Sequence, residues 1–382
     1  MLYPKNESPA LSDELFRNPT SEYRGTPFWA WNCKIKKEEA LRQIECFREM
    51  GFGGFHIHSR TGLDTPYLGK EFMEAVRACS DKAEQEKMLC WLYDEDRWPS
   101  GAAGGYVTED PKFRARRLLF CSEEKELCDE ADGGPVKLLA RYAVLLENDL
   151  LKSYRRLSEG ETVSGGEVER FAYLEVNENH QVWYNDFAYA DTLNKAAIDK
   201  FIKVTHEKYY ETLGDRFSKS VPAIFSDEPQ FNPKQTLRFP NDAGEVRIPY
   251  TDDLDDTYYE AFGEHLLDRL PEVFWEMADG LPSLTRYHYH DHTAERFACA
   301  FADNIGGWCE EHKLMMTGHM MEEPTLHSQS AVLGDAMRSY RSFQLPGIDM
   351  LCDQREYTTA KQAQSAAQFK VQGWNWTLNL EP

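Results

Sequence analysis

The chain has 382 residues, 13% of them aromatic, and a formal net charge of −22 at pH 7. A surface this acidic repels nucleic acid and anionic membranes, so neither is an expected partner. Residues 1–10 are polar, and no apolar stretch approaches the roughly 18 residues of a membrane span. Together with nine cysteines that lack any CxxC pair, this predicts a cytoplasmic protein. The oligomeric state stays open.

Strand and helix signals alternate over the first hundred residues, which is typical of an α/β fold with a parallel sheet. In the first expected helix, Ala40, Ile44 and Phe47 share one face. The sequence predicts strands at 26–31, 53–58 and 88–93 and helices at 36–50 and 71–86.

The alternation breaks after the third strand. The sequence predicts a cluster of short strands at 117–121, 136–146, 171–176 and 181–184. We interpret this region as a β-rich insertion carried on a barrel loop, where such folds tolerate additions. The chain then divides into a first part of the barrel, the insertion and a continuation of the barrel, at 1–113, 114–190 and 191–382.

The alternation then resumes. The sequence predicts helices at 194–213, 253–270, 283–312 and 358–369 and strands at 221–226, 314–318 and 347–351. The polar segment 231–251 is expected to form an active-site loop. Six strands are two short of a closed barrel. The expected fold is therefore α/β, a (β/α)8 TIM-barrel-like fold that is incomplete at the C-terminus and carries a β-rich insertion.

Polar side chains gather at the predicted carboxyl ends of the strands, where (β/α)8 enzymes hold their active sites. His56 and His58 are two residues apart and share one face of a strand, so both point into the barrel or both point out. The other candidates for a polar pocket are Asn32, Arg60, Tyr93, Asp94, Glu95, Trp98, Asp227, Glu228, His319, Glu322, Glu323, Asp349, Asp353 and Arg355.

A carboxylate pair is the chemistry that these residues favour. One protonated and one ionised carboxyl group across a pocket can hydrolyse a glycoside. Glu228 follows an apolar strand that favours its neutral form, so we assign it as the proton donor. Glu323 is the expected base, with Glu322 as the alternative. The substrate-binding candidates are His56, His58, Arg60, Tyr93, Asp94, Trp98, Asp227, His319 and Glu322.

The residue pattern by itself neither predicts nor excludes a metal site. A His pair indicates a metal weakly, because neighbouring carboxylates can satisfy the same imidazoles. The His-rich run at 287–292 begins a predicted helix and fits packing better. The Gly-rich segment 100–105 lacks nucleotide-binding spacing and favours a loop over the pocket.

Several motifs resemble, in order, the catalytic region of the α-L-rhamnosidase-like glycoside hydrolases of family 106. They are PFWAWN, GFGGFHIHSRTGL, WLYDEDRWPSG, FSDEP, TGHMMEEPTLHSQ and PGIDML. The resemblance implies a (β/α)8 barrel, an inverting mechanism with two glutamates, a calcium ion near the sugar, and an oligosaccharide or glycoside substrate. It implies Glu228 as general acid and Glu323 as candidate base, with His56, His58, Asp94 and Asp227 lining the sugar or metal site.

Two departures from that family keep other functions open. The β-rich accessory domains of the family are missing, and so is a later Ser-Glu strand end, in whose place the chain runs into GWNWTLNLEP. The alternatives are a TIM-barrel glycosidase for another sugar and a truncated, catalytically silent sugar-binding protein. A metal-dependent hydrolase or isomerase on the same scaffold is a further alternative.

Overall fold

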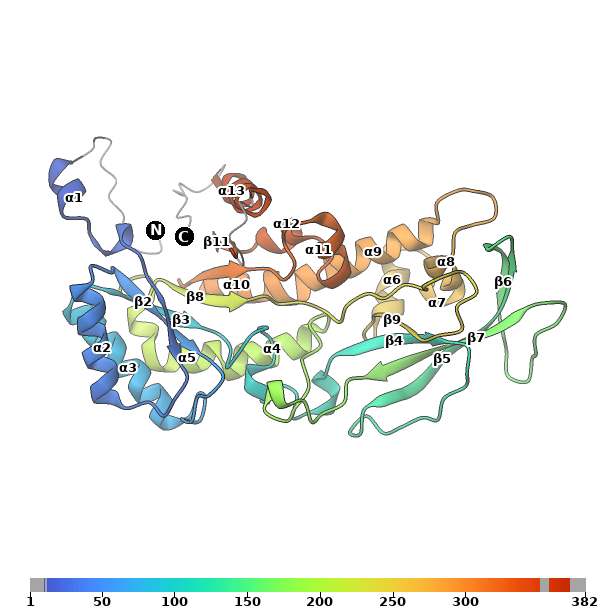
Figure 1. The fold of residues 1–382 in the computed structure, drawn as a ribbon, viewed down its shortest axis with the longest axis horizontal. Helices are drawn as coiled ribbons and strands as arrows, with labels where there is room; N and C mark the ends of the chain where they lie inside the picture. Colours follow the sequence, from blue (N-terminus) through green and yellow to red (C-terminus); the bar gives the residue numbers. More distant parts are fainter. Residues whose placement is uncertain (1–9, 11, 351–356, 372–382) are drawn as a thin grey trace.

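The computed structural model describes residue 10, residues 12–350 and residues 357–371, and its strands form two sheets. One sheet has six parallel strands and the other has five antiparallel strands. Figure 1 shows the two sheets along the long axis of the molecule, with the antiparallel sheet beyond the carboxyl ends of the parallel strands. The expected α/β class, with a parallel sheet and an added β-rich part, is therefore confirmed.

The parallel sheet takes its strands in chain order, as successive β/α units do. All neighbouring pairs are parallel. The strands are β1 (Phe28–Trp31), β2 (Gly54–Ser59), β3 (Leu89–Tyr93), β8 (Ala223–Asp227), β10 (Met315–His319) and β11 (Leu345–Pro346). The sixth strand thus lies just before the predicted 347–351, and residue 351 lies outside the described residues.

The parallel sheet curls strongly. The rings of Phe28 on β1 and Phe225 on β8 lie 5.0 Å apart, although β2 and β3 separate these strands in the sheet. Within the described residues β1 and β11 do not pair with each other, so these residues form an open, barrel-like sheet and not a closed eight-stranded barrel.

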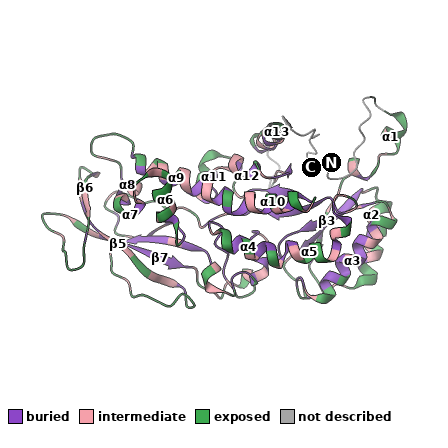
Figure 2. Ribbon diagram, turned by 180° about the vertical axis from the view of Figure 1, so that it is seen from behind, coloured by how far each residue is buried: buried purple, intermediate pink, exposed green. Residues whose placement is uncertain are grey.

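Helices cover the outer face of this sheet because their apolar residues repeat every three or four positions. In α3 (Lys70–Gln85) the buried residues include Phe72, Val76, Cys79 and Ala83. Figure 2 shows this division between buried inner faces and exposed outer faces of the helices. The other helices of this layer are α2 (Lys37–Glu49), α4 (Lys195–Val204), α5 (His206–Leu213), α10 (Asn304–Glu311), α12 (Ala336–Tyr340) and α13 (Thr358–Val371).

Three long predicted helices are divided in the structure. The first divides at Thr205, whose hydroxyl donates to the carbonyl oxygen of Phe201. The second ends at Gly263, which has a φ of +75°. The third contains a π-helical turn, Ala298–Asp303. The remaining helices are α1 (Asp13–Arg17), α6 (Leu254–Phe262), α7 (Leu266–Arg269), α8 (Pro271–Phe274), α9 (Leu284–Phe297) and α11 (Leu326–Val332).

The antiparallel sheet has the strand order β6-β5-β7-β4-β9. Its strands are β4 (Arg116–Cys121), β5 (Gly134–Glu147), β6 (Leu150–Arg156), β7 (Val168–Val176) and β9 (Val246–Pro249). The sequence analysis missed both edge strands, β6 and β9. The strand predicted at 181–184 is wrong, because Val182–Tyr184 forms a 3-10 turn. The segment 231–251, expected to be only a loop, supplies β9, while the three-part domain division stays a prediction.

None of the helices in the described part of the chain is both long and apolar enough to cross a membrane.

Candidate active site

The strand register brings the candidate side chains of the parallel sheet to one end of its inner face. In the β8–β10 pair, Asp227 stands opposite His319. His58 on β2 points inward, since its ring stacks on Tyr93 with centroids 3.8 Å apart and lies 4.7 Å from Phe28. His56 also points inward, and the two orientations left open by the sequence are thereby resolved.

Gly318 allows the β8 and β10 strand ends to approach closely. Its φ is +133°, and a Cβ at this position would lie 1.9 Å from the carbonyl oxygen of Ser226. A side chain at 318 would therefore push the two strands apart and separate His319 from Asp227. Glycine is required here both for its backbone conformation and for this contact.

Asp227 is the centre of the cluster. The Tyr93 hydroxyl donates to its Oδ2 at 2.9 Å, and His319 Nε2 lies 3.3 Å from its Oδ1. His58 Nε2 and Arg60 Nη2 each lie 3.9 Å from Oδ2. Burial alone would raise the pKa of Asp227, but the charge of His319 and the hydroxyl of Tyr93 hold it below its usual range. The carboxylate is therefore ionised at neutral pH.

His319 lies between two carboxylates, with its Nε2 3.3 Å from Asp227 and 3.5 Å from Asp349. Burial opposes its charge, yet these two carboxylates and that of Glu323 raise its pKa to about 9. His58 lies deeper and behaves in the opposite way, because burial, with Arg60 nearby, lowers its pKa to about 3. At neutral pH, His319 is thus a cation and His58 is neutral.

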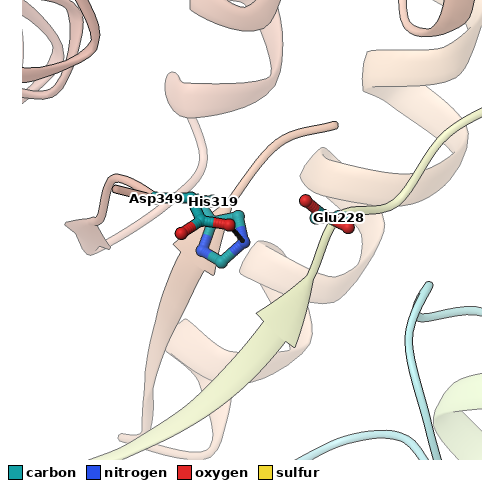
Figure 3. Close-up of side chains that lie close together, drawn as sticks. All are labelled: Glu228, His319 and Asp349. Atoms are coloured by element: carbon teal, nitrogen blue, oxygen red, sulfur yellow. Dashed lines mark ion pairs between the residues drawn. The ribbon is translucent and has the colours of Figure 1, made fainter. Parts of the chain in front are cut away.

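Glu228 stands at the exposed side of this cluster. Figure 3 shows its side chain across from His319 and Asp349. Its backbone turns sharply at a φ of +47°, and its N–H donates to the carbonyl oxygen of His319 at 3.2 Å. Burial, reinforced by the charges of Asp227, Asp349 and Glu323 and opposed by that of His319, raises its pKa to about 7. A glutamate in this position can carry and release a proton near neutral pH.

Glu323 is buried in the same cluster, with only 3% of its surface exposed. The Tyr340 hydroxyl donates to its Oε2, and the Asp349 N–H donates to its Oε1 at 2.8 Å. Burial raises the pKa of Glu323, while these two donors favour its ionised form. Glu322, the alternative base, is exposed at a φ of +53°. The structure therefore brings Glu323, and not Glu322, into the cluster.

Three predicted pocket residues lie beside the cluster. The Asp94 carboxylate is buried and accepts from the hydroxyls of Ser100 and Ser226, so it holds the loop after β3 against β8. His56 lies one pleat below His58, among aromatic rings. Trp98 is half-buried in the loop after β3. The candidates Asp353 and Arg355 lie outside the described residues.

The sequence analysis missed Ser100 and Tyr340, whereas Glu95 was among its strand-end candidates. Ser100 Oγ accepts the Asp227 N–H at 2.8 Å, and Tyr340 reaches Glu323 from α12. For Ser100, the available signal was its place in the Gly-rich segment behind a strand end. Tyr340 carries no sequence signal, since it enters the site only through the packing of its helix.

Glu95 organises the Gly-rich loop at 100–105. Its carboxylate accepts five backbone N–H groups, three at Oε2 and two at Oε1, with distances of 2.6–3.0 Å. They come from Asp96, Gly101, Ala102, Ala103 and Gly104. This loop carries Ser100, so Glu95 also helps to fix the position of the Asp227 backbone, to which Ser100 is hydrogen-bonded.

Glu95→Gln is expected to lower the free energy of unfolding by about 2–4 kcal/mol, because the new amide donor would face buried N–H groups that lose their acceptor. Urea unfolding followed by tryptophan fluorescence measures the change. Glu109→Gln is the matched control, as Glu109 is exposed nearby in the same stretch of chain, and a change within about 0.5 kcal/mol is expected there. Equal stabilities of the two variants would contradict this role for Glu95.

Glu228, His319 and Asp349 are candidate ligands of a cation, because their ligand atoms all lie within 4.8 Å of one another. Calcium takes six to eight oxygen ligands. This set offers two carboxylates and one imidazole nitrogen, which is too few oxygen ligands. These three residues therefore do not fit calcium, and the calcium ion implied by the motif resemblance stays a prediction.

No family model and no curated protein sequence matches the chain. Among solved structures, the chain is similar to a rhamnosidase from Novosphingobium sp. PP1Y, with a TM-score of 0.60 and 12% sequence identity. The fold is rhamnosidase-like. The alignment covers 94% of this chain and 52% of that one, so the chain spans about half the length of the rhamnosidase. At this identity the likeness concerns the fold alone, and membership of family 106 stays a prediction.

Proposed function

We propose that the protein is a glycoside hydrolase that removes terminal rhamnose from glycans by an inverting, α-L-rhamnosidase-like mechanism on a (β/α)8-type scaffold. The observation that carries the proposal is Glu228, a half-buried glutamate with a pKa of about 7 at the carboxyl end of β8. It stands beside the ionised carboxylate of Asp227. The rhamnosidase-like fold supports the same choice of chemistry.

In this mechanism the two glutamates divide the acid and base work. Glu228 donates its proton to the glycosidic oxygen as the bond from that oxygen to the anomeric carbon breaks. Glu323 accepts a proton from a water molecule that attacks the anomeric carbon from the opposite face. The products are the free alcohol and a sugar of inverted anomeric configuration. Each glutamate then regains its starting state by proton exchange with water.

The other polar groups hold the sugar. The guanidinium of Arg60 is partly exposed and can donate to sugar hydroxyls, while Asp227 can accept from them. Tyr93, His58 and His319 fix the orientation and charge of Asp227. The aromatic rings of Phe28 and Phe225 form an apolar floor below these groups.

Hydrolysis of 4-nitrophenyl α-L-rhamnoside tests this function. Proton NMR of the first product is expected to show the β-anomer before mutarotation. If the protein instead released another sugar from a panel of aryl glycosides, that sugar would be the substrate in place of rhamnose. Rhamnose binding without turnover of any glycoside would instead identify a sugar-binding protein.

Glu323→Gln is expected to lower kcat by roughly 10²–10⁴-fold, because the attacking water loses its base. Azide, which needs no base, is expected to restore turnover and give the inverted glycosyl azide. The comparison variant is Glu322→Gln, which changes the exposed neighbour. If Glu322→Gln, and not Glu323→Gln, lowered kcat and was rescued by azide, Glu322 would be the base.

A further inference from the structure

The turn Val182–Tyr184, between β7 and α4, places a tryptophan from the β-rich part of the chain against the loop after β3. The rings of Trp183 and Trp98 lie 5.2 Å apart at 58° to each other. The indole N–H of Trp183 donates to the carbonyl oxygen of Trp98 at 2.6 Å. Trp183 nevertheless remains 39% exposed. The pair thus presents an aromatic surface that the described residues do not cover fully.

Hydrogen bonds hold this turn in place. The side-chain amide of Asn185 donates to Asp96 Oδ2 at 3.0 Å and to the carbonyl oxygen of Gly104 at 2.9 Å. Arg97 donates to Asn185 Oδ1 at 2.8 Å. Such a turn keeps its tryptophan in one orientation, which lowers the entropy lost when a ligand packs on the ring.

The same loop is bonded directly to the strand end that carries the candidate acid. Ser100, two residues after Trp98, donates its N–H to the Asp227 carbonyl oxygen at 2.8 Å and accepts the Asp227 N–H at its Oγ. Tyr189 adds a second link, since its hydroxyl donates to the Ser100 carbonyl oxygen and accepts the Gln230 N–H. The loop that carries Trp98 is therefore joined by hydrogen bonds to the end of β8, and Glu228 is the next residue after Asp227.

We propose that Trp98 and Trp183 form the subsite for the leaving group, the part of the glycoside that is released when Glu228 donates its proton. The inference rests on the proposed function. The ligand chemistry is a ring with a flat apolar face, either a neighbouring sugar or an aromatic aglycone, because such faces pack on indole rings. Trp183 is thus a specificity-determining residue that the β-rich part supplies to the barrel-like part.

Binding and kinetics of Trp183→Ala test the proposal with three ligands that share rhamnose, namely methyl α-L-rhamnoside, phenyl α-L-rhamnoside and a rhamnosyl-glucose disaccharide. Loss of a stacking contact corresponds to roughly a tenfold change in affinity. KM and Kd are expected to rise about tenfold for the phenyl or the disaccharide ligand and to stay unchanged for the methyl ligand. Whichever ligand responds identifies the leaving group as aromatic or as a sugar.

Two further variants separate binding from folding. Trp183→Phe keeps a flat ring and is expected to recover most of the affinity for the responding ligand. Val182→Ala is the matched control, because Val182 lies on the same turn and is 86% exposed. It is expected to leave all three ligands unaffected. Equal changes for all three ligands in Trp183→Ala, or no change for any, would overturn the proposal.

The outcomes also distinguish this proposal from the proposed function. NMR titration of Glu228→Gln, with and without Trp183→Ala, measures binding without turnover. Suppose that the protein hydrolyses no glycoside but binds ring-containing ligands more tightly, and that Trp183→Ala abolishes this preference. That result would support the proposed subsite and contradict the proposed hydrolase function. Hydrolysis of rhamnosides with no effect of Trp183→Ala on the phenyl or disaccharide ligand would support the hydrolase function and contradict the proposed subsite.

Discussion

Glu228→Gln is expected to lower kcat by roughly 10²–10⁴-fold on a rhamnoside whose leaving group is an ordinary alcohol. An alkoxide is a poor leaving group, so the glycosidic oxygen must be protonated as its bond breaks. Gln has almost the same shape as Glu but has no acidic proton to donate. The variant therefore removes the proposed chemistry and keeps the packing around β8.

The leaving group provides the control for this prediction. A 2,4-dinitrophenolate leaves without protonation, so the loss on 2,4-dinitrophenyl α-L-rhamnoside is expected to be smaller than on the alkyl glycoside by at least about tenfold. An equal loss on both substrates would show that Glu228 acts in binding or folding and not as the acid.

The pH profile of the same pair of proteins gives an independent reading. The acid must be protonated to act, and its pKa is about 7. Activity of the unmodified protein is therefore expected to fall as the pH rises through about 7. Because Gln does not ionise, the remaining activity of Glu228→Gln is expected to lack this basic limb. A basic limb unchanged in the variant would assign it to another group.

His319→Gln is expected to lower the free energy of unfolding by about 3 kcal/mol at neutral pH. The buried carboxylate of Asp227 would lose its closest cation, and the remaining charge would be poorly compensated. The pKa of His319 is raised from 6.5 to about 9 in the folded protein. Its contribution to stability is therefore fully present below pH 6.5 and is lost as the pH rises through about 9.

Urea unfolding of both proteins at several pH values measures this contribution as a difference. The two unfolding free energies are expected to differ by about 3 kcal/mol at pH 6 and to converge above pH 9. The matched control is His180→Gln, because His180 lies 3.1 Å from Asp186 in an exposed ion pair. Exposed pairs contribute roughly 0–1 kcal/mol. A pH-independent difference for His319→Gln would show that packing, and not charge, carries its effect.

The parallel strands could be predicted because their signals are local. In β3 four of the five residues are buried and in β8 all five are, and both strands draw on short apolar runs in the sequence, 88–93 and 221–225. The edge strands β6 and β9 lack such a run. β6 has one buried residue in seven, and β9 has four residues that pair only with β4. Their strand conformation depends on a partner strand, which the sequence around them does not reveal.

The candidate site shows the same division. Asp227, Glu228 and His319 could be predicted, since polar residues directly after apolar strands meet at one end of a parallel sheet. The sequence ranked Glu323 above Glu322 but kept Glu322 as the alternative, because adjacent residues with the same side chain differ only in how the backbone turns after β10, which buries Glu323 and exposes Glu322. The position of Asp94 behind the pocket likewise follows from its hydrogen bonds to Ser100 and Ser226.

By itself, the sequence determined the alternation of strands and helices, the acidic strand ends and the motifs that resemble rhamnosidases. These features depend on neighbours within about ten residues, because apolar periodicity and strand ends are local properties. Only the tertiary structure decided which carboxyl groups are charged and which rings stand together. The pKa of Glu228 is set by burial and by charges on other strands, and Trp183 reaches Trp98 from 85 residues away. Electrostatic interactions and aromatic packing act through space between residues that are far apart in the sequence, so only the folded structure reveals them.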